Sequence, residues 1–163
     1  MIENEVFKRN TMKNSLLISI LIISFISCKD PNSYEVFESN WQKCSIQYNK
    51  TETFQKMLGR WKLVGTSCGY CSHSGYKNTD KNVEIVISQD SVLSTYENEK
   101  LVHSKTFSMV SFSSVNEKSF SLKLPPPYVG NTYTYGVIEF CDNTVAFRSS
   151  YIDGEDYFFN KIK

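Results

Sequence analysis

The stretch VEIVISQDSVLSTYENEKLVHSKT, residues 83–106, decides the fold. Every second residue from Val83 to Ile87 is apolar and β-branched, which is the period of a strand with one buried face. Gln89-Asp90 and Glu97-Asn98-Glu99 separate this run from the next two apolar runs, and both are short turn sequences. The stretch therefore predicts two consecutive β-hairpins.

The same period of two continues on both sides of these hairpins. Aromatic residues make up 14% of the chain, and Ala is nearly absent, as is typical of strands rather than helices. Two connections, 67–82 and 125–131, are long, and the second contains three prolines that stop strand pairing. We expect eight strands, at 61–66, 83–88, 92–96, 101–110, 119–124, 133–141, 145–149 and 157–162.

Eight short antiparallel strands either close into an up-and-down barrel or split into a sandwich. Closure removes exposed edges, so the pattern favours an all-β, eight-stranded antiparallel up-and-down barrel. A short N-terminal helix precedes the first strand, with Thr51 or Thr53 as its cap, Phe54, Met57 and Leu58 on one face, and Gly59 as its stop.

Bulk composition limits the function classes. With 163 residues the chain has room for one domain plus appendages. It has 18 Lys and Arg against 17 Asp and Glu, a net charge of +1, which gives no basic surface for a phosphate backbone. We therefore expect no nucleic-acid partner, and we expect a monomer.

Residues 1–27 have the pattern of a signal peptide. Lys8, Arg9 and Lys13 precede an apolar run at 16–26, which is too short to cross a bilayer as a helix. Met12 is an alternative start, because Met-Lys-Asn before the apolar run already makes a complete signal.

The residues Phe25-Ile26-Ser27-Cys28 resemble a bacterial lipobox. The resemblance implies that Cys28 becomes the new N-terminus and is diacylated with fatty acids such as palmitate. Two acyl chains are enough for stable membrane anchoring. Lys29 follows, not the Asp that retains some lipoproteins in the inner membrane, so we expect a lipoprotein of the outer membrane, facing the periplasm or the cell surface. The alternative is an ordinary secretory signal that happens to end near a Cys. Residues 28–50 are polar, and we expect them to form a tether between the lipidated Cys28 and a domain at 51–163.

The heptapeptide Leu58-Gly59-Arg60-Trp61-Lys62-Leu63-Val64 resembles the Gly-x-Trp start of the first strand in the lipocalin family. The resemblance covers residues 51–163 in strand order and count. It implies that the short helix closes the base of the barrel, and that Trp61 packs over it under a basic side chain from the last strand. Lys161 and Lys163 are available there, and Arg148 is an alternative on the neighbouring strand.

Four cysteines remain after Cys28, an even number for an oxidising compartment, and three pairings are possible. If the strands alternate in direction, Cys68 and Cys71 lie at the rim of the barrel. Cys141 then ends its strand at the base, beside the segment that contains Cys44. We therefore predict the disulfides Cys44–Cys141 and Cys68–Cys71.

No catalytic pattern stands out in the sequence. The segment Cys68-Gly69-Tyr70-Cys71-Ser72-His73 lacks the helix of a thioredoxin-like redox site, and Ser72 interrupts a haem motif. A zinc site made of Cys68, Cys71 and His73 would need a fourth ligand, and His103 or Cys141 would have to supply it from elsewhere in the fold. The acidic turn of Asp153, Glu155 and Asp156 is expected to be solvated, and His103 to lie on the surface. We expect no enzyme, cofactor or metal.

Function is expected to be binding. One face of the strand at 101–110 is small and partly polar, which leaves room for a ligand inside the barrel. Tyr133, Tyr135, Phe147 and Tyr157 are candidates to line such a cavity. The leading hypothesis is non-catalytic binding of a small apolar molecule at the open end. The alternative is a filled barrel whose outer surface serves as a protein-interaction, adhesion or inhibitor module.

Overall fold

The computed structural model describes residues 34–68, 75–112, 119–126, 133–149 and 154–162. The chain divides into two compact units, Met1–Asp30 and Pro31–Lys163. The second unit contains its own hydrophobic core, which is what an independently folding domain requires.

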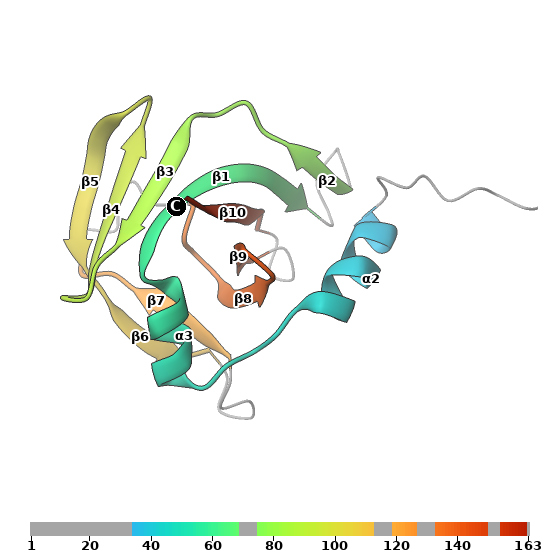
Figure 1. The fold of residues 1–163 in the computed structure, drawn as a ribbon, viewed down its shortest axis with the longest axis horizontal. Coiled ribbons are helices and arrows are strands. Elements are labelled where there is room, and N and C mark those ends of the chain that lie inside the picture. Colours follow the sequence, from blue (N-terminus) through green and yellow to red (C-terminus); the bar gives the residue numbers. More distant parts are fainter. Residues whose placement is uncertain (1–33, 69–74, 113–118, 127–132, 150–153, 163) are drawn as a thin grey trace, which may run out of the picture. The chain divides into compact units, whose positions relative to one another are not determined.

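Two helices and ten strands are present in the described residues (Figure 1). The helices are α2 (Tyr34–Cys44) and α3 (Lys50–Met57). The strands are β1 (Gly59–Cys68), β2 (Gly75–Asn78), β3 (Val83–Ile87), β4 (Val92–Glu97), β5 (Lys100–Thr106), β6 (Ser108–Ser111), β7 (Phe120–Lys123), β8 (Val137–Cys141), β9 (Thr144–Arg148) and β10 (Asp156–Ile162).

All the strand pairings are antiparallel. The main sheet has the order β5-β4-β3-β1-β10-β9-β8, and β2 pairs with the far end of β1. β6 and β7 form a separate two-stranded sheet. The expectation of a mostly antiparallel β protein is therefore confirmed, and the main sheet of the described residues is open, with β5 and β8 at its edges.

The structure differs from the predicted strands in three places. β2 lies in the connection that we expected to be a loop. The strand predicted at 101–110 is two strands, because β5 pairs with β4 whereas β6, after Phe107, pairs with β7 in a separate sheet. β8 begins at Val137, so Tyr133 and Tyr135 precede it.

Helix α3 lies close to the predicted position, but its cap was wrong. Asn49, not Thr51 or Thr53, caps the helix, and its side chain accepts from the Glu52 backbone N–H at 3.0 Å. Glu52 reaches back to the Asn49 backbone N–H, which completes a capping box. Gly59 follows with φ +118°, a conformation that other residues rarely adopt, so the chain turns there from helix to strand.

The inner face of the sheet and helix α3 enclose one hydrophobic cluster, which we call the inner core. It takes alternate residues from most of the strands, as a half-buried sheet requires. Its largest fully buried side chains are Phe147, Phe159, Met57, Leu63, Ile85, Ile87, Leu93 and Val145.

The expectation of a small, partly polar inner face at 101–110 was wrong. Phe107 and Met109, the large residues, are the ones that join the inner core, each 7% exposed. Leu101 and Val102 are 56% and 52% exposed at the sheet edge. The face that carries His103, Lys105, Phe107 and Met109 is the inward one, because His103 and Lys105 are half-buried whereas Ser104 and Thr106 are exposed.

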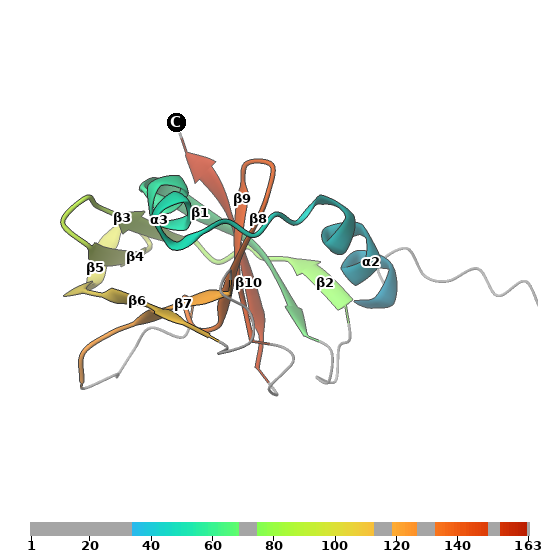
Figure 2. The same ribbon diagram turned by 90° about the horizontal axis from the view of Figure 1, so that it is seen from below.

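Helix α2 was not predicted, since its residues were expected to lie in the tether. Figures 1 and 2 show it beside β2, away from α3, and it also contacts β8. Phe37 and Trp41, one helical turn apart, pack with Phe158 of β10 on the outer face of the sheet. The domain therefore begins earlier than residue 51, with a helix that covers part of the outer face.

Candidate functional site

The four predicted ligand-lining residues do not surround a common space. Phe147 is fully buried in the inner core, edge-on to Phe159 with ring centroids 6.0 Å apart. Tyr157 is also in the inner core, and Tyr133 packs edge-on against it at 5.3 Å. Tyr135 is 59% exposed and does not join them. Phe147, Tyr157 and Tyr133 therefore pack against other protein side chains, and Tyr135 stands apart from them.

Tyr133 is hydrogen-bonded to the last residue of β4. Its hydroxyl donates to Oε1 of Glu97 at 3.2 Å, and the Tyr157 hydroxyl donates to Oε2 of Glu155 at 2.9 Å. Burial, followed by the nearby charge and hydrogen bond of Glu97 and the charge of Glu155, raises the pKa of Tyr133 above its ordinary value. Tyr133 therefore stays neutral at physiological pH.

Trp61 of the Gly-x-Trp motif lies where the resemblance implied, against the end of α3. It is 2% exposed, and its Nε1 donates to the Met57 carbonyl at 2.7 Å. Nζ of Lys161, on the last strand, stands 5.0 Å from the centre of the indole ring. Lys161, not Arg148, is therefore the basic residue at this site. A cavity of about 230 Å³ opens beside this pair, between Tyr48, Phe140 and the β8–β9 turn.

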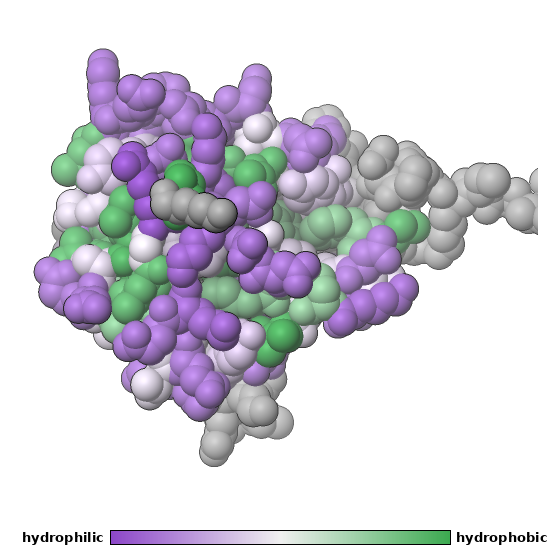
Figure 3. All heavy atoms as spheres, viewed as in Figure 1, coloured by the Kyte–Doolittle hydropathy of each residue, from purple (hydrophilic) through white to green (hydrophobic). Residues whose placement is uncertain are grey.

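A second cavity lies on the outer face of the sheet, between α2 and strands β1, β2, β9 and β10. We call it the α2 pocket, and its volume is about 350 Å³. In Figure 3 hydrophobic side chains are visible in a recess between the main sheet and the α2 end of the domain. The pocket is lined by Phe37, Trp41, Val64, Tyr76, Asn78, Thr144, Phe158 and Asn160.

The four aromatic rings of the α2 pocket have a defined arrangement. Phe37 stacks on Tyr76 with centroids 4.8 Å apart and an interplanar angle of 16°, and it lies at 24° to Trp41. Phe158 is edge-on to all three. Gly65 permits this arrangement, because a Cβ there would lie 2.3 Å from the end of the Tyr76 ring.

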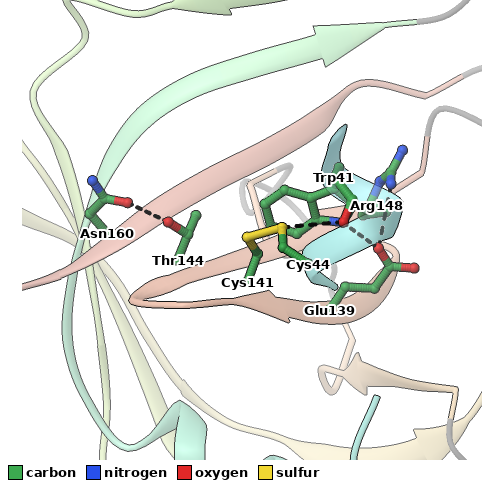
Figure 4. Close-up of a disulfide and its surroundings, with 7 residues drawn as sticks. All are labelled: Trp41, Cys44, Glu139, Cys141, Thr144, Arg148 and Asn160. Atoms are coloured by element: carbon green, nitrogen blue, oxygen red, sulfur yellow. Dashed lines mark hydrogen bonds and ion pairs between the residues drawn. A yellow bond between two sulfur atoms is a disulfide. The ribbon is translucent and has the colours of Figure 1, made fainter. Parts of the chain in front are cut away.

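The polar wall of the pocket consists of Thr144 on β9 and Asn160 on β10. The hydroxyl of Thr144 donates to Oδ1 of Asn160 at 2.7 Å (Figure 4). This bond orients the amide, so Nδ2 of Asn160 points away from Thr144 and keeps its two N–H donors for other acceptors. Asn78 adds a second, exposed amide from β2.

A buried ionic network fixes α2 to the sheet. Nε of Arg148 donates to the fully buried Asp156 at 3.0 Å, and its terminal nitrogens bond Glu38 of α2 and, at 3.4 Å, Glu139 of β8. Burial alone lowers the pKa of Arg148, but the hydrogen bond with Glu38 and the charges of Asp156 and Glu139 raise it further than burial lowers it. Arg148 is therefore always charged.

Trp41 links this network to the α2 pocket. Its Nε1 donates to Oε2 of Glu139 at 2.6 Å, the same oxygen that Arg148 bonds (Figure 4). Asp156 also accepts from the Ser149 backbone N–H at 2.8 Å. The expectation of a solvated acidic turn was therefore wrong for Asp156, which is 0% exposed.

The predicted disulfide Cys44–Cys141 is confirmed, with Cα atoms 5.2 Å apart (Figure 4). It joins the last residue of α2 to the last residue of β8 and closes a separation of 97 residues. Beside it, the Ile46 backbone N–H donates to the Phe140 carbonyl at 2.7 Å. The segment after α2 is thereby attached to the sheet.

The second predicted disulfide is described only in part. Cys68 is disulfide-bonded, and Cys71 and His73 lie outside the described residues, so the pairing Cys68–Cys71 stays a prediction. Because Cys68 and Cys141 are both oxidised, neither is available as the thiolate that a zinc site needs. No cluster of metal-ligating side chains occurs within the part of the chain that the structure describes.

Sequence reasoning missed the α2 pocket and the Arg148 network. One signal was available for the helix, because Phe37, Trp41 and Cys44 are spaced i, i+4 and i+7, as on one face of a helix. The partners of Arg148 carry no local signal, since Glu38 lies 110 residues away. Cys28 and the rest of the predicted signal and anchor lie outside the described residues.

Comparison of this chain with known protein families, with curated proteins and with solved structures finds no match. Neither described helix has the length and hydrophobicity of a membrane-spanning segment.

Proposed function

We propose that this chain is a lipoprotein of the bacterial cell envelope, anchored in the outer membrane through acylated Cys28, and that its domain is a non-catalytic binding module. The disulfide Cys44–Cys141 supports export, because such bonds persist in oxidising compartments. The signal-like residues 1–27 and the lipobox-like Phe25 to Cys28 support lipid anchoring.

Anchoring is tested by metabolic labelling with an alkyne analogue of palmitate in cells that express the full chain. The expected result is that the wild type is labelled and sediments with the outer membrane. Cys28→Ala should lose both properties, whereas Ser33→Ala, a control in the predicted tether, should keep both. Label that persists in Cys28→Ala, or an unlabelled wild type, would overturn the anchor.

The domain is proposed to be a lipocalin-like, eight-stranded up-and-down barrel. Three observations support this architecture: the strand order follows the chain, β1 pairs with β10, and Lys161 stands over Trp61 beside α3. β6, counted with β5 as the one strand predicted at 101–110, and β7 would complete the wall between β5 and β8, and β7 contacts β8. Among the described residues, no ladder joins β7 to β8, and β2 and α2 are additions to the family's plan.

The filled inner core carries the functional proposal. Phe147, Phe159 and Leu93 occupy the interior at zero exposure, Tyr157 belongs to the same cluster, and Tyr133 packs against it. An apolar ligand would have to displace side chains that pack to the density of a protein interior. We therefore favour the alternative from the sequence, a filled domain that binds through its outer surface, over a carrier of small apolar molecules.

The test is calorimetric titration of palmitate into residues 31–163, exported behind a cleavable signal so that the disulfides form. The wild type and Phe112→Ala, an exposed matched control, should show no saturable binding. Phe147→Ala should be destabilised by about 3–5 kcal/mol and open a cavity that apolar probes enter. Saturable binding of palmitate by the wild type would overturn the filled interior and restore the carrier.

A further inference from the structure

We propose that the α2 pocket binds a neutral saccharide. This inference rests on the proposed function, since it assigns the outer-surface binding to one site and one ligand class. The pocket of about 350 Å³ falls within the range of roughly 300–1,000 Å³ that is usual for small-molecule sites.

The chemistry of the lining disfavours ionic ligands and purely apolar ligands. Five of the eight lining residues are aromatic or aliphatic, and the other three are Asn78, Thr144 and Asn160. Because the lining offers no carboxylate, amine or guanidinium, it has no counter-charge for an ionic ligand. A purely apolar ligand would cover the two amides and the hydroxyl without bonding them, which costs free energy. A neutral ligand with both C–H faces and hydroxyl groups meets both requirements.

The positions of these groups suit a sugar ring. A pyranose carries C–H groups on its faces and hydroxyls around its edge, each hydroxyl being both donor and acceptor. Phe37 and Tyr76, which are half-buried and stacked with centroids 4.8 Å apart, supply the accessible apolar surface, and the buried Trp41 and Phe158 pack against Phe37.

The polar wall matches neighbouring hydroxyls. Nδ2 of Asn160 can donate, while the hydroxyl oxygen of Thr144, whose proton is used in the bond to Asn160, can accept. A donor and an acceptor side by side are complementary to two adjacent hydroxyls. Figure 4 shows this pair on one side and the Trp41 indole on the other.

The pocket is also rigid, which lowers the entropy cost of binding. Its α2 wall is held by the disulfide Cys44–Cys141, by the bonds of Arg148 to Glu38, and by the Trp41 bond to Glu139. The Asn160 and Thr144 wall belongs to paired strands β9 and β10. No large rearrangement is needed to form the site.

Binding is measured by intrinsic fluorescence of residues 31–163 carrying Trp61→Phe, so that Trp41 is the reporter. The titrants are maltotriose, cellotriose, mannobiose and lactose. We expect at least one to shift the emission saturably, with Asn160→Ala and Thr144→Val each weakening it about tenfold. Asn143→Ala, an exposed residue in the β8–β9 turn and outside this pocket, is the matched control and should bind as the parent does.

Thermal unfolding verifies that each variant is folded. A folded parent that binds none of the four saccharides, or that binds equally well with Asn160→Ala and Thr144→Val, would overturn the saccharide site. If no saccharide binds and palmitate does not bind either, the saccharide site is wrong but the proposal of a module that binds through its outer surface is kept. Palmitate binding would overturn the proposed function itself, so the two failures are distinguishable.

Discussion

Gly65→Ala should be destabilising, although it removes a glycine from a strand. A Cβ at this position would lie 2.3 Å from Cζ and Oη of Tyr76 and 2.5 Å from Cε2. Carbon atoms in contact are separated by about 3.5–4.0 Å, so the Tyr76 ring must move by more than about 1 Å. The ring is held by stacking on Phe37 and by the edge of Phe158.

The magnitude follows from two opposing terms. Overpacking costs about 1–3 kcal/mol, and replacing Gly by Ala where φ is ordinary gains about 0.4–1 kcal/mol through the unfolded state. The net loss for Gly65→Ala is then about 1–2 kcal/mol. With Tyr76→Ala already present the clash is gone, so the same change should be neutral or stabilising.

Urea unfolding of the four proteins in this double-mutant cycle gives the free energy of unfolding of each. The account predicts a coupling of about 2 kcal/mol between Gly65 and Tyr76. An equal cost of Gly65→Ala in both backgrounds would refute the placement of Tyr76 across β1, and with it the floor of the α2 pocket.

Four further outcomes are expected. Reducing Cys44–Cys141, or replacing both with Ser, should destabilise by up to about 4.7 kcal/mol, measured as a fall in Tm; an unchanged Tm would show that the bond contributes nothing. Arg148→Ala leaves a fully buried carboxylate without its ion partner and should cost about 3–5 kcal/mol in urea, and a cost below 1 kcal/mol would contradict the network. Lys161→Ala should lower the free energy of unfolding by about 0.5–1 kcal/mol and change the fluorescence of Trp61, whereas Lys161→Arg should leave the stability and the fluorescence unchanged. Equal effects of the two substitutions would contradict the cation–π contact. The pKa of Tyr133 is raised above 10 in the folded protein, so the stabilisation from its protonated hydroxyl is fully present below pH 10 and is lost as the pH rises through the pKa of the folded state. An absorbance titration should therefore show a phenol that ionises above pH 10, and Tyr133→Phe should remove it.

Strand positions were predictable because their signal is local. A period of two over 83–106 and the turn residues at Asn98 and Asp142, both with positive φ, determine where strands begin and end. The disulfide Cys44–Cys141 followed from alternating strand direction alone, since that direction places Cys141 at the end of the sheet near α3.

The missed features depend on contacts between distant segments. Helix α2 is polar apart from a few residues, so its stability comes from the sheet that it covers and from the Arg148 bonds. β2 exists because it pairs with β1, and its four residues include Gly and Asn, which rarely indicate strands. Tyr133 and Tyr135 were expected to lie on a strand at 133–141, but they precede β8, where strand alternation does not apply.

The most direct test of the central claim is native mass spectrometry of residues 31–163 purified from a periplasm. The account predicts a species lighter by two hydrogens for each disulfide, including Cys44–Cys141, with no copurified apolar adduct, because the interior is filled. A stoichiometric apolar adduct on the folded, oxidised domain would contradict the filled interior and identify a carrier.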